Sequence, residues 1–201
     1  METQMETQMK TESMREKTAG RGRTYDMAYA ALFAVMIAIC SWITIPTVVP
    51  FTLQTFAVFL AVSVLGGRRG TMTVVVYVLL GVMGVPVFAG FRGGIGVLLN
   101  TTGGYIIGFI FAALVMWLLE ALFGRKIGVQ AAGMALGMAT YLTVGTAWFM
   151  AVYLHQTGAV SLGTVLGWCV IPFLVPDIVK LVLALSLGNL LHRQLAGMLE
   201  R

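Results

Sequence analysis

The segment VLGWCVIPFLVPDIVKLVLALSLGNLL (Val165–Leu191) is long and apolar enough to cross a lipid bilayer. A bilayer's hydrocarbon core is about 30 Å thick, so a spanning helix needs about 20 mostly apolar residues. Pro172 and Pro176 interrupt its first part, and proline suits the first turn of a helix, so we expect the regular helix to begin near Pro176. The segment therefore predicts a transmembrane helix with Asp177 and Lys180 near its start.

The composition of the whole chain also indicates a membrane protein. Of its 201 residues, 59% are hydrophobic and 10% are charged, and the mean hydropathy is +0.91. A typical soluble domain is about half apolar and about a quarter charged. The formal charge of +5 could suit nucleic acid, but the basic residues punctuate apolar runs and form no continuous stripe. We therefore expect a lipid bilayer around the chain and no nucleic-acid partner.

Five further apolar segments precede the last one, each bounded by Gly, Pro or charge. They are Met27–Ile45, Phe51–Gly66, Thr71–Val87, Gly104–Phe123 and Gly128–Tyr153. The predicted fold is an all-α integral membrane protein, a bundle of six transmembrane helices over residues 27–195, which we expect to bind the substrate. Residues 1–26 are polar, contain the tandem METQ-METQ and lack the apolar core of a signal peptide. We expect them to be a disordered cytoplasmic tail, and residues 196–201 to be a cytoplasmic end.

The basic residues predict the orientation of the six helices. Lys and Arg are retained on the cytoplasmic side of membrane proteins. With both termini inside, eleven of the thirteen basic residues fall on the inner side. The two exceptions are Arg92, in an outer loop, and Lys180, inside the last helix. The pattern favours a multi-pass protein of the cell membrane with cytoplasmic termini.

Asp177 and Lys180 are the charges that need an explanation. An ionisable side chain at membrane depth costs a few kcal/mol, and such residues usually face a cavity or a partner. Their spacing of three places them on one helix face, and the start of this helix lies on the same side as Arg92. Together the three carry one net positive charge, which suits a ligand with one carboxylate. Asp177 could orient Lys180 or accept hydrogen bonds from the ligand, and a purely structural ion pair is the alternative.

Other candidate residues come from an irregular segment and from two helices. The glycine-rich stretch Phe88–Tyr105 is the least helix-like part of the membrane region, and irregular backbone is tolerated there where it lines a cavity. The further candidates for the ligand site are Asn100, Gln54, Tyr105, Tyr141 and Trp148. For the aromatic residues, a place at the membrane interface is the alternative. Ala30 and Ala34 form a small-residue face that a partner helix could approach closely.

Sequence motifs of the common enzymes are missing from the chain. It has no GxxxxGK[ST] phosphate loop, no HExxH helix and no GxSxG elbow. Cys40 and Cys169 have no second Cys or His at ligand spacing, so we interpret them as packing residues. We therefore expect no catalytic residues, no metal site and no cofactor.

Five motifs together resemble the BioY family, the biotin-capturing S components of energy-coupling-factor (ECF) vitamin transporters. The motifs are PFTLQTF (50–56), GVPVFAG (84–90), TGGY (102–105), GTAW (145–148) and PDIVK (176–180). The resemblance implies a six-helix bundle that holds biotin near its outer face, with Asp177 and Lys180 in the site and Arg92 and Asn100 in or beside it. Where the family commonly has GPTGGY, this chain has NTTGGY (100–105).

The resemblance also implies partners and a mechanism. The partners are a membrane coupling protein, which would contact the face with Ala30 and Ala34, and two cytoplasmic ATPases. The biotin carboxylate would point toward Lys180 or Arg92, and its ureido ring toward Asn100 and Asp177. Three alternatives remain: a binding subunit for another vitamin, an intramembrane lipid-acting enzyme with Asp177 as base, and a structural subunit in which the ion pair only bridges helices.

Overall fold

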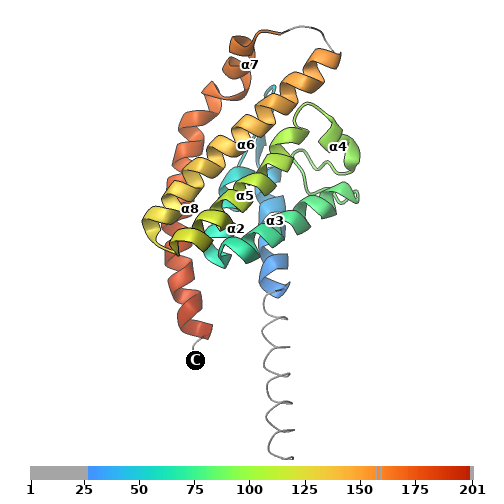
Figure 1. The fold of residues 1–201 in the computed structure, drawn as a ribbon. Helices are drawn as coiled ribbons and strands as arrows, with labels where there is room; N and C mark the ends of the chain where they lie inside the picture. Colours follow the sequence, from blue (N-terminus) through green and yellow to red (C-terminus); the bar gives the residue numbers. More distant parts are fainter. Residues whose placement is uncertain (1–26, 157, 159, 200–201) are drawn as a thin grey trace, which may run out of the picture.

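A computed structural model describes residues 27–156, 158 and 160–199, which are mostly helical (Figure 1). The elements in chain order are a first helix Met27–Trp42, β1 (Thr44–Ile45), β2 (Phe51–Thr52), α2 (Gln54–Leu65), α3 (Gly67–Val82), α4 (Ile95–Leu99), α5 (Gly103–Phe123), α6 (Ile127–Gln156), α7 (Leu162–Cys169) and α8 (Ile171–Leu199). The predicted tail 1–26 lies outside the described residues.

Three of the stretches are long and apolar enough to cross a membrane. They are α5, α6 and the α7–α8 stretch Leu162–His192. The first helix and α2 are apolar but shorter, and α3 has 16 residues. The chain is thus a helical membrane protein, while the count of six spans stays a prediction.

A short β-hairpin separates the first helix from α2, and the sequence analysis missed it. We predicted helix through Ile45 and again from Phe51, but the helix ends at Trp42 and α2 begins at Gln54. Between them, β1 and β2 pair antiparallel, with Ile45 opposite Phe51. The flanking prolines, Pro46 and Pro50, explain the difference, because proline disfavours helix at the preceding residue and ends hydrogen-bond ladders.

The last predicted span is divided into α7 and α8, which meet at Val170. The expectation that the regular helix begins near Pro176 was wrong, because α8 begins at Ile171 and contains Pro176. Pro172 lies in the first turn of α8, where its missing N–H costs nothing, so only Pro176 removes a helical hydrogen bond. At its other end α8 runs to Leu199, past the boundary that we predicted at residue 195.

The helices pack into one bundle whose two ends differ. α5 lies along α6, and α2 lies against α3 and α8. Glycine allows the closest approach between α5 and α6: a Cβ at Gly145 would overlap the Tyr105 ring, and one at Gly104 would overlap Trp148. The β-hairpin, α4 and α7 gather at one end (Figure 1). The α2–α3 corner, the α5–α6 corner and the C-terminal part of α8 lie at the other end.

Candidate ligand-binding site

A cavity lies inside the end of the bundle that carries the hairpin and α4. About 660 Å³ of empty space, including its opening to solvent, lies between its walls. Six of the eight predicted ligand-site residues line it: Gln54, Arg92, Tyr105, Tyr141, Asp177 and Lys180. The tertiary structure thus brings together side chains from α2, the α3–α4 loop, α5, α6 and α8.

Asp177 and Lys180 form a buried ion pair in the wall of this cavity. Lys180 Nζ lies 2.8 Å from Asp177 Oδ1, and the two residues are 5% and 1% exposed. The i, i+3 spacing on α8 places both on one face, as predicted. The pair is neutral, so burial costs less than it would for either charge alone.

Each partner of the ion pair is also held by another element. Lys180 Nζ donates to the carbonyl oxygen of Thr52 at 2.8 Å and lies 3.9 Å from the centre of the Phe51 ring. The Tyr141 hydroxyl donates to the other oxygen of Asp177. Both carboxylate oxygens are therefore engaged, which supports the interpretation that Asp177 orients Lys180.

Arg92 supplies the positive charge at the mouth of the cavity. It follows a tight turn in which Gly90 and Phe91 have φ of 71° and 57°, and Phe88 pairs with Arg92 across the turn. The Phe91 ring stacks on Trp42 at 4.8 Å between centroids, which stabilises this unusual backbone conformation. Arg92 Nε donates to Ala89 O at 3.1 Å. No described residue accepts a hydrogen bond from its terminal nitrogens, so they are available to an anion.

Gln54 brings a buried amide to the cavity at the first residue of α2. It is 4% exposed, and its Nε2 donates to the Tyr77 hydroxyl at 2.9 Å. Tyr77 in turn donates to Val87 O at 2.8 Å, which fixes the loop that carries Arg92. No described residue donates to Gln54 Oε1, so this oxygen can accept a hydrogen bond from a ligand.

Aromatic side chains form the apolar part of the wall. Tyr105 is buried, and its hydroxyl lies 3.3 Å from Thr146 Oγ1. Phe109 packs against Tyr141, with ring centroids 5.3 Å apart. These rings give a ligand an apolar surface beside the charged groups.

Asn100 and Trp148 were predicted in the site but do not line the cavity. The Trp148 indole donates to the backbone carbonyl of Asn100 at 3.0 Å, and the Asn100 side chain accepts from Thr101 N. The Asn100 side chain is exposed and Trp148 is half-buried. They hold the end of the loop before α5 in place, because an indole N–H can satisfy a backbone carbonyl as readily as a ligand.

The hydrogen bond from Trp148 to Asn100 predicts that Trp148 stabilises the loop before α5. Trp148→Phe removes one hydrogen bond to the loop, and we expect it to lower the free energy of unfolding by about 1 kcal/mol. Thermal unfolding of purified protein measures this. Trp168→Phe is the matched control, because no described residue accepts a hydrogen bond from the Trp168 indole. Equal unfolding temperatures for the two variants would contradict the role.

The predicted partner face on the first helix points partly inward. Ala34 is 4% exposed and belongs to the core, and Ala30 is half-buried. In this arrangement Ala34 is buried, and a partner interface on this face stays a prediction. Leu32 and Val35 are exposed on the same helix. Neighbours four apart on a helix share a face, but the sequence alone did not show that this face meets the protein's own core.

Several cavity residues were not predicted as site residues. Among them are Thr52, Phe88, Phe109, Cys169 and Phe173. Cys169 was expected to be a packing residue and is 1% exposed, so it packs and also lines the cavity. Thr52 contributes through its backbone carbonyl, which no side-chain pattern reveals. Pro46 and Pro50 were the one sequence signal that could have predicted the hairpin.

Comparison with known proteins places the chain in a family. The model of the BioY family matches residues 6–197. The chain belongs to the BioY family. Among related BioY proteins, the "Biotin transporter BioY" of Thermotoga maritima is 43% identical over 157 residues, which cover 77% of this chain and 88% of that protein. The "Probable biotin transporter BioY" of Pyrococcus horikoshii is 36% identical and covers 83% of this chain and 96% of its own length.

Solved structures agree with this assignment at the level of the fold. The crystal structure of "the S-component for biotin from an ECF-type ABC transporter" superimposes with a TM-score of 0.74 at 23% identity, over 86% of this chain and 93% of that one. The structure of "the S component of a bacterial ECF transporter" gives a TM-score of 0.54 at 17% identity, over 89% and 99%. The chain thus has the fold of these S components.

Proposed function

We propose that this chain captures biotin and takes part in its uptake as the substrate-specific S component of an ECF-type importer, without covalent chemistry. The observation that carries the proposal is the buried Asp177–Lys180 pair in the wall of a cavity that Arg92 also lines. Membership of a family whose named members are biotin transporters supplies the substrate. The chain is thus a transporter component and not an enzyme.

The charges, hydrogen-bonding groups and apolar rings of the cavity wall suit biotin. Arg92 and Lys180 contribute two positive charges and Asp177 one negative charge, so one net positive charge meets the single carboxylate of the vitamin. The terminal nitrogens of Arg92 and the remaining N–H of Lys180 are the donors for that carboxylate. Gln54 Oε1 and the Asp177 carboxylate are the acceptors for the ureido N–H groups. The apolar rings of Tyr105, Phe109 and Tyr141 would cover the thiophane ring.

This pose differs from the sequence-based hypothesis at Asn100. The hypothesis placed the ureido ring near Asn100, but the side chain of Asn100 is exposed and lies outside the cavity. Gln54 is the better candidate for that contact. A role for Asn100 in ligand binding would require the loop before α5 to rearrange.

The proposal includes topology and partners. Six membrane spans with both termini in the cytoplasm would place the cavity at the outer face of the cell membrane, and the α2–α3 and α5–α6 corners at the inner face. Arg68, Arg69, Arg125 and Lys126 at these corners support that orientation. A membrane coupling protein and two cytoplasmic ATPases would supply the energy for release, because the chain has no phosphate loop of its own.

Titration of biotin into detergent-purified protein tests the proposal. We expect saturable binding with one site per chain, in the nanomolar range typical of capture from scarce supply. Riboflavin and thiamine serve as competitors that should not displace biotin. Binding of either vitamin in place of biotin would reject the substrate, and turnover of a lipid by the same preparation would reject the transporter assignment.

A further inference from the structure

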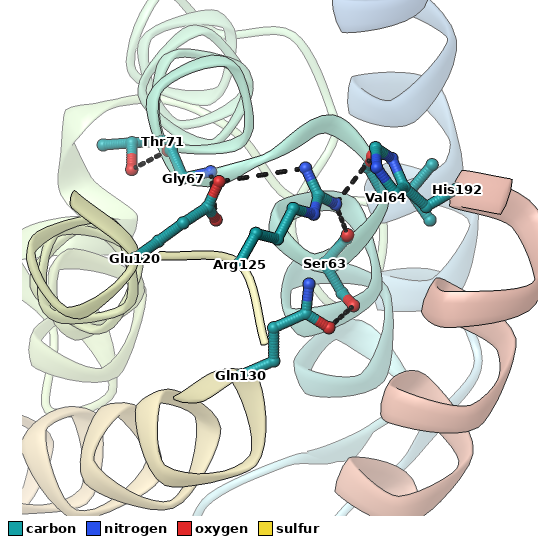
Figure 2. Close-up of polar contacts among 8 residues, drawn as sticks. All are labelled: Ser63, Val64, Gly67, Thr71, Glu120, Arg125, Gln130 and His192. Carbon is teal, nitrogen blue, oxygen red and sulfur yellow. Dashed lines mark hydrogen bonds and ion pairs between the residues drawn. The ribbon is translucent and has the colours of Figure 1, made fainter. Parts of the chain in front are cut away.

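The α2–α3 corner lies at the end of the bundle opposite the cavity. An ion pair of the α5–α6 corner, Glu120 with Arg125, binds to it (Figure 2). Arg125 Nη2 donates to the carbonyl oxygens of Ser63 and of Val64, the latter at 3.1 Å. Glu120 Oε2 accepts from the backbone N–H of Gly67 at 2.9 Å. Arg125 Nη1 and Glu120 Oε1 are 3.8 Å apart. The pair therefore contacts the end of α2 and the start of α3 at once.

The signs of these charges match the helix ends that they contact. The last four carbonyl groups of a helix lack partners within it and carry partial negative charge, and the first N–H groups carry partial positive charge. The positive Arg125 lies at the C-terminus of α2 and the negative Glu120 at the N-terminus of α3. Burial lowers the pKa of the Arg125 guanidinium, and the Glu120 carboxylate raises it. An arginine side chain stays charged at physiological pH, so the contact persists there.

The corner is shaped to receive the guanidinium. Gly66 connects α2 to α3 with φ of 85°, a conformation that favours glycine. A Cβ at this position would lie 2.8 Å from Arg125 Nη1, so a side chain there would displace the guanidinium. The backbone conformation thus favours glycine at position 66, and its missing side chain leaves room for the guanidinium.

α8 joins the same corner and thereby connects it to the cavity. His192 Nδ1 lies 3.2 Å from Val64 O, and since a carbonyl only accepts, the ring nitrogen is the donor. A Cβ at Gly188 would overlap the Ser63 side chain, so α2 and α8 are in close contact there. Lys180 of α8 reaches Thr52 just before α2. The seam between α2 and α8 is therefore held at both ends.

We propose that Arg125 is a positioning residue for ligand binding: by capping α2 it sets how α2 lies against α8, and so how Gln54 and Lys180 are placed relative to each other in the cavity wall. The inference rests on the proposed function. α2 extends 12 residues from Gln54 to Leu65, about 18 Å at 1.5 Å per residue. A small tilt at the corner therefore moves the cavity end, and binding sites tolerate misplacement of only about 0.5 Å.

The test compares Arg125→Met with two controls in the full chain. Lys126→Met removes the same charge from the neighbouring exposed residue, and Arg125→Lys keeps the charge without the planar fork. We expect Arg125→Met to weaken biotin binding about fivefold, Arg125→Lys to weaken it less, and Lys126→Met to leave it unchanged. Calorimetric titration below the unfolding temperature of each variant measures these affinities. If Arg125→Met fails to fold, Glu120→Gln replaces it and should weaken binding in the same direction.

Hydrogen–deuterium exchange provides a readout that needs no ligand. We expect Arg125→Met to speed exchange at both ends of α2, around Ser63–Gly67 and around Thr52–Ala57, while Lys126→Met does neither. Faster exchange only at Ser63–Gly67, together with unchanged biotin affinity, would reduce Arg125 to a local cap and overturn the inference. If the wild-type chain does not bind biotin, the proposed function fails, and the exchange pattern still decides whether Arg125 controls the cavity end of α2.

Discussion

Replacing Lys180 with methionine is expected to weaken biotin binding about 10- to 100-fold. Methionine keeps most of the length of the side chain but removes its charge and its N–H groups. The variant therefore loses a charge-assisted hydrogen bond to the ligand carboxylate, typically about 1.5–3 kcal/mol, which no other residue replaces. Calorimetric titration of the purified variant measures the loss. Lys126→Met, at an exposed position, is the control for the change in total charge.

Stability and binding need to be separated for this variant. Lys180→Met leaves Asp177 buried with Tyr141 as its remaining partner, and breaking a buried ion pair typically costs about 3–5 kcal/mol. The double variant Asp177→Asn with Lys180→Met removes both charges. We expect it to recover part of the lost unfolding temperature and none of the lost affinity. Recovery of biotin binding in the double variant would show that the ion pair is structural only.

Replacing Arg92 with glutamine is expected to weaken biotin binding about tenfold and to leave binding of the amide of biotin nearly unchanged. Arg92 is exposed at the mouth of the cavity, so water and salt screen its charge and its effect is smaller than that of Lys180. The amide lacks the carboxylate, so it gains little from Arg92. Titration of both ligands into both proteins at two salt concentrations measures the difference.

The controls for Arg92 follow from the same reasoning. Arg68→Gln removes an exposed positive charge from the α2–α3 corner and should change neither affinity. An equal loss for biotin and its amide would mean that Arg92 shapes the loop instead of contacting the carboxylate. The backbone pairing of Phe88 with Arg92 does not depend on the side chain, so we expect the turn to persist in the variant.

The contrast between predicted and missed features has a physical origin. Asp177 and Lys180 could be predicted because a buried charge is costly wherever it occurs, which is a property of the segment itself. Trp148 and Asn100 were assigned to the site from their chemistry, but each can satisfy the other, and they do so across 48 residues of sequence. The residue types indicated which side chains could form hydrogen bonds, but they did not indicate with which partners.

The helix boundaries and the Ala30–Ala34 face likewise depend partly on sequence and partly on tertiary structure. Hydropathy located the apolar segments, but the hairpin at Thr44–Thr52 and the start of α8 at Ile171 depend on local backbone hydrogen bonding around prolines. Ala34 faces the core because of how the first helix packs, which its spacing from Ala30 does not encode.

By itself the sequence determined that the chain is a membrane protein and that its last helix carries two charges that must face a cavity or a partner. Both conclusions follow from one segment, because apolar content and the cost of buried charge are properties of the segment itself. Only the tertiary structure decided which groups meet that pair. Lys180 donates to the carbonyl of Thr52, 128 residues away, and Tyr141 donates to Asp177 from another helix. Such contacts depend on how distant elements pack, and a backbone carbonyl leaves no trace in the identity of its side chain.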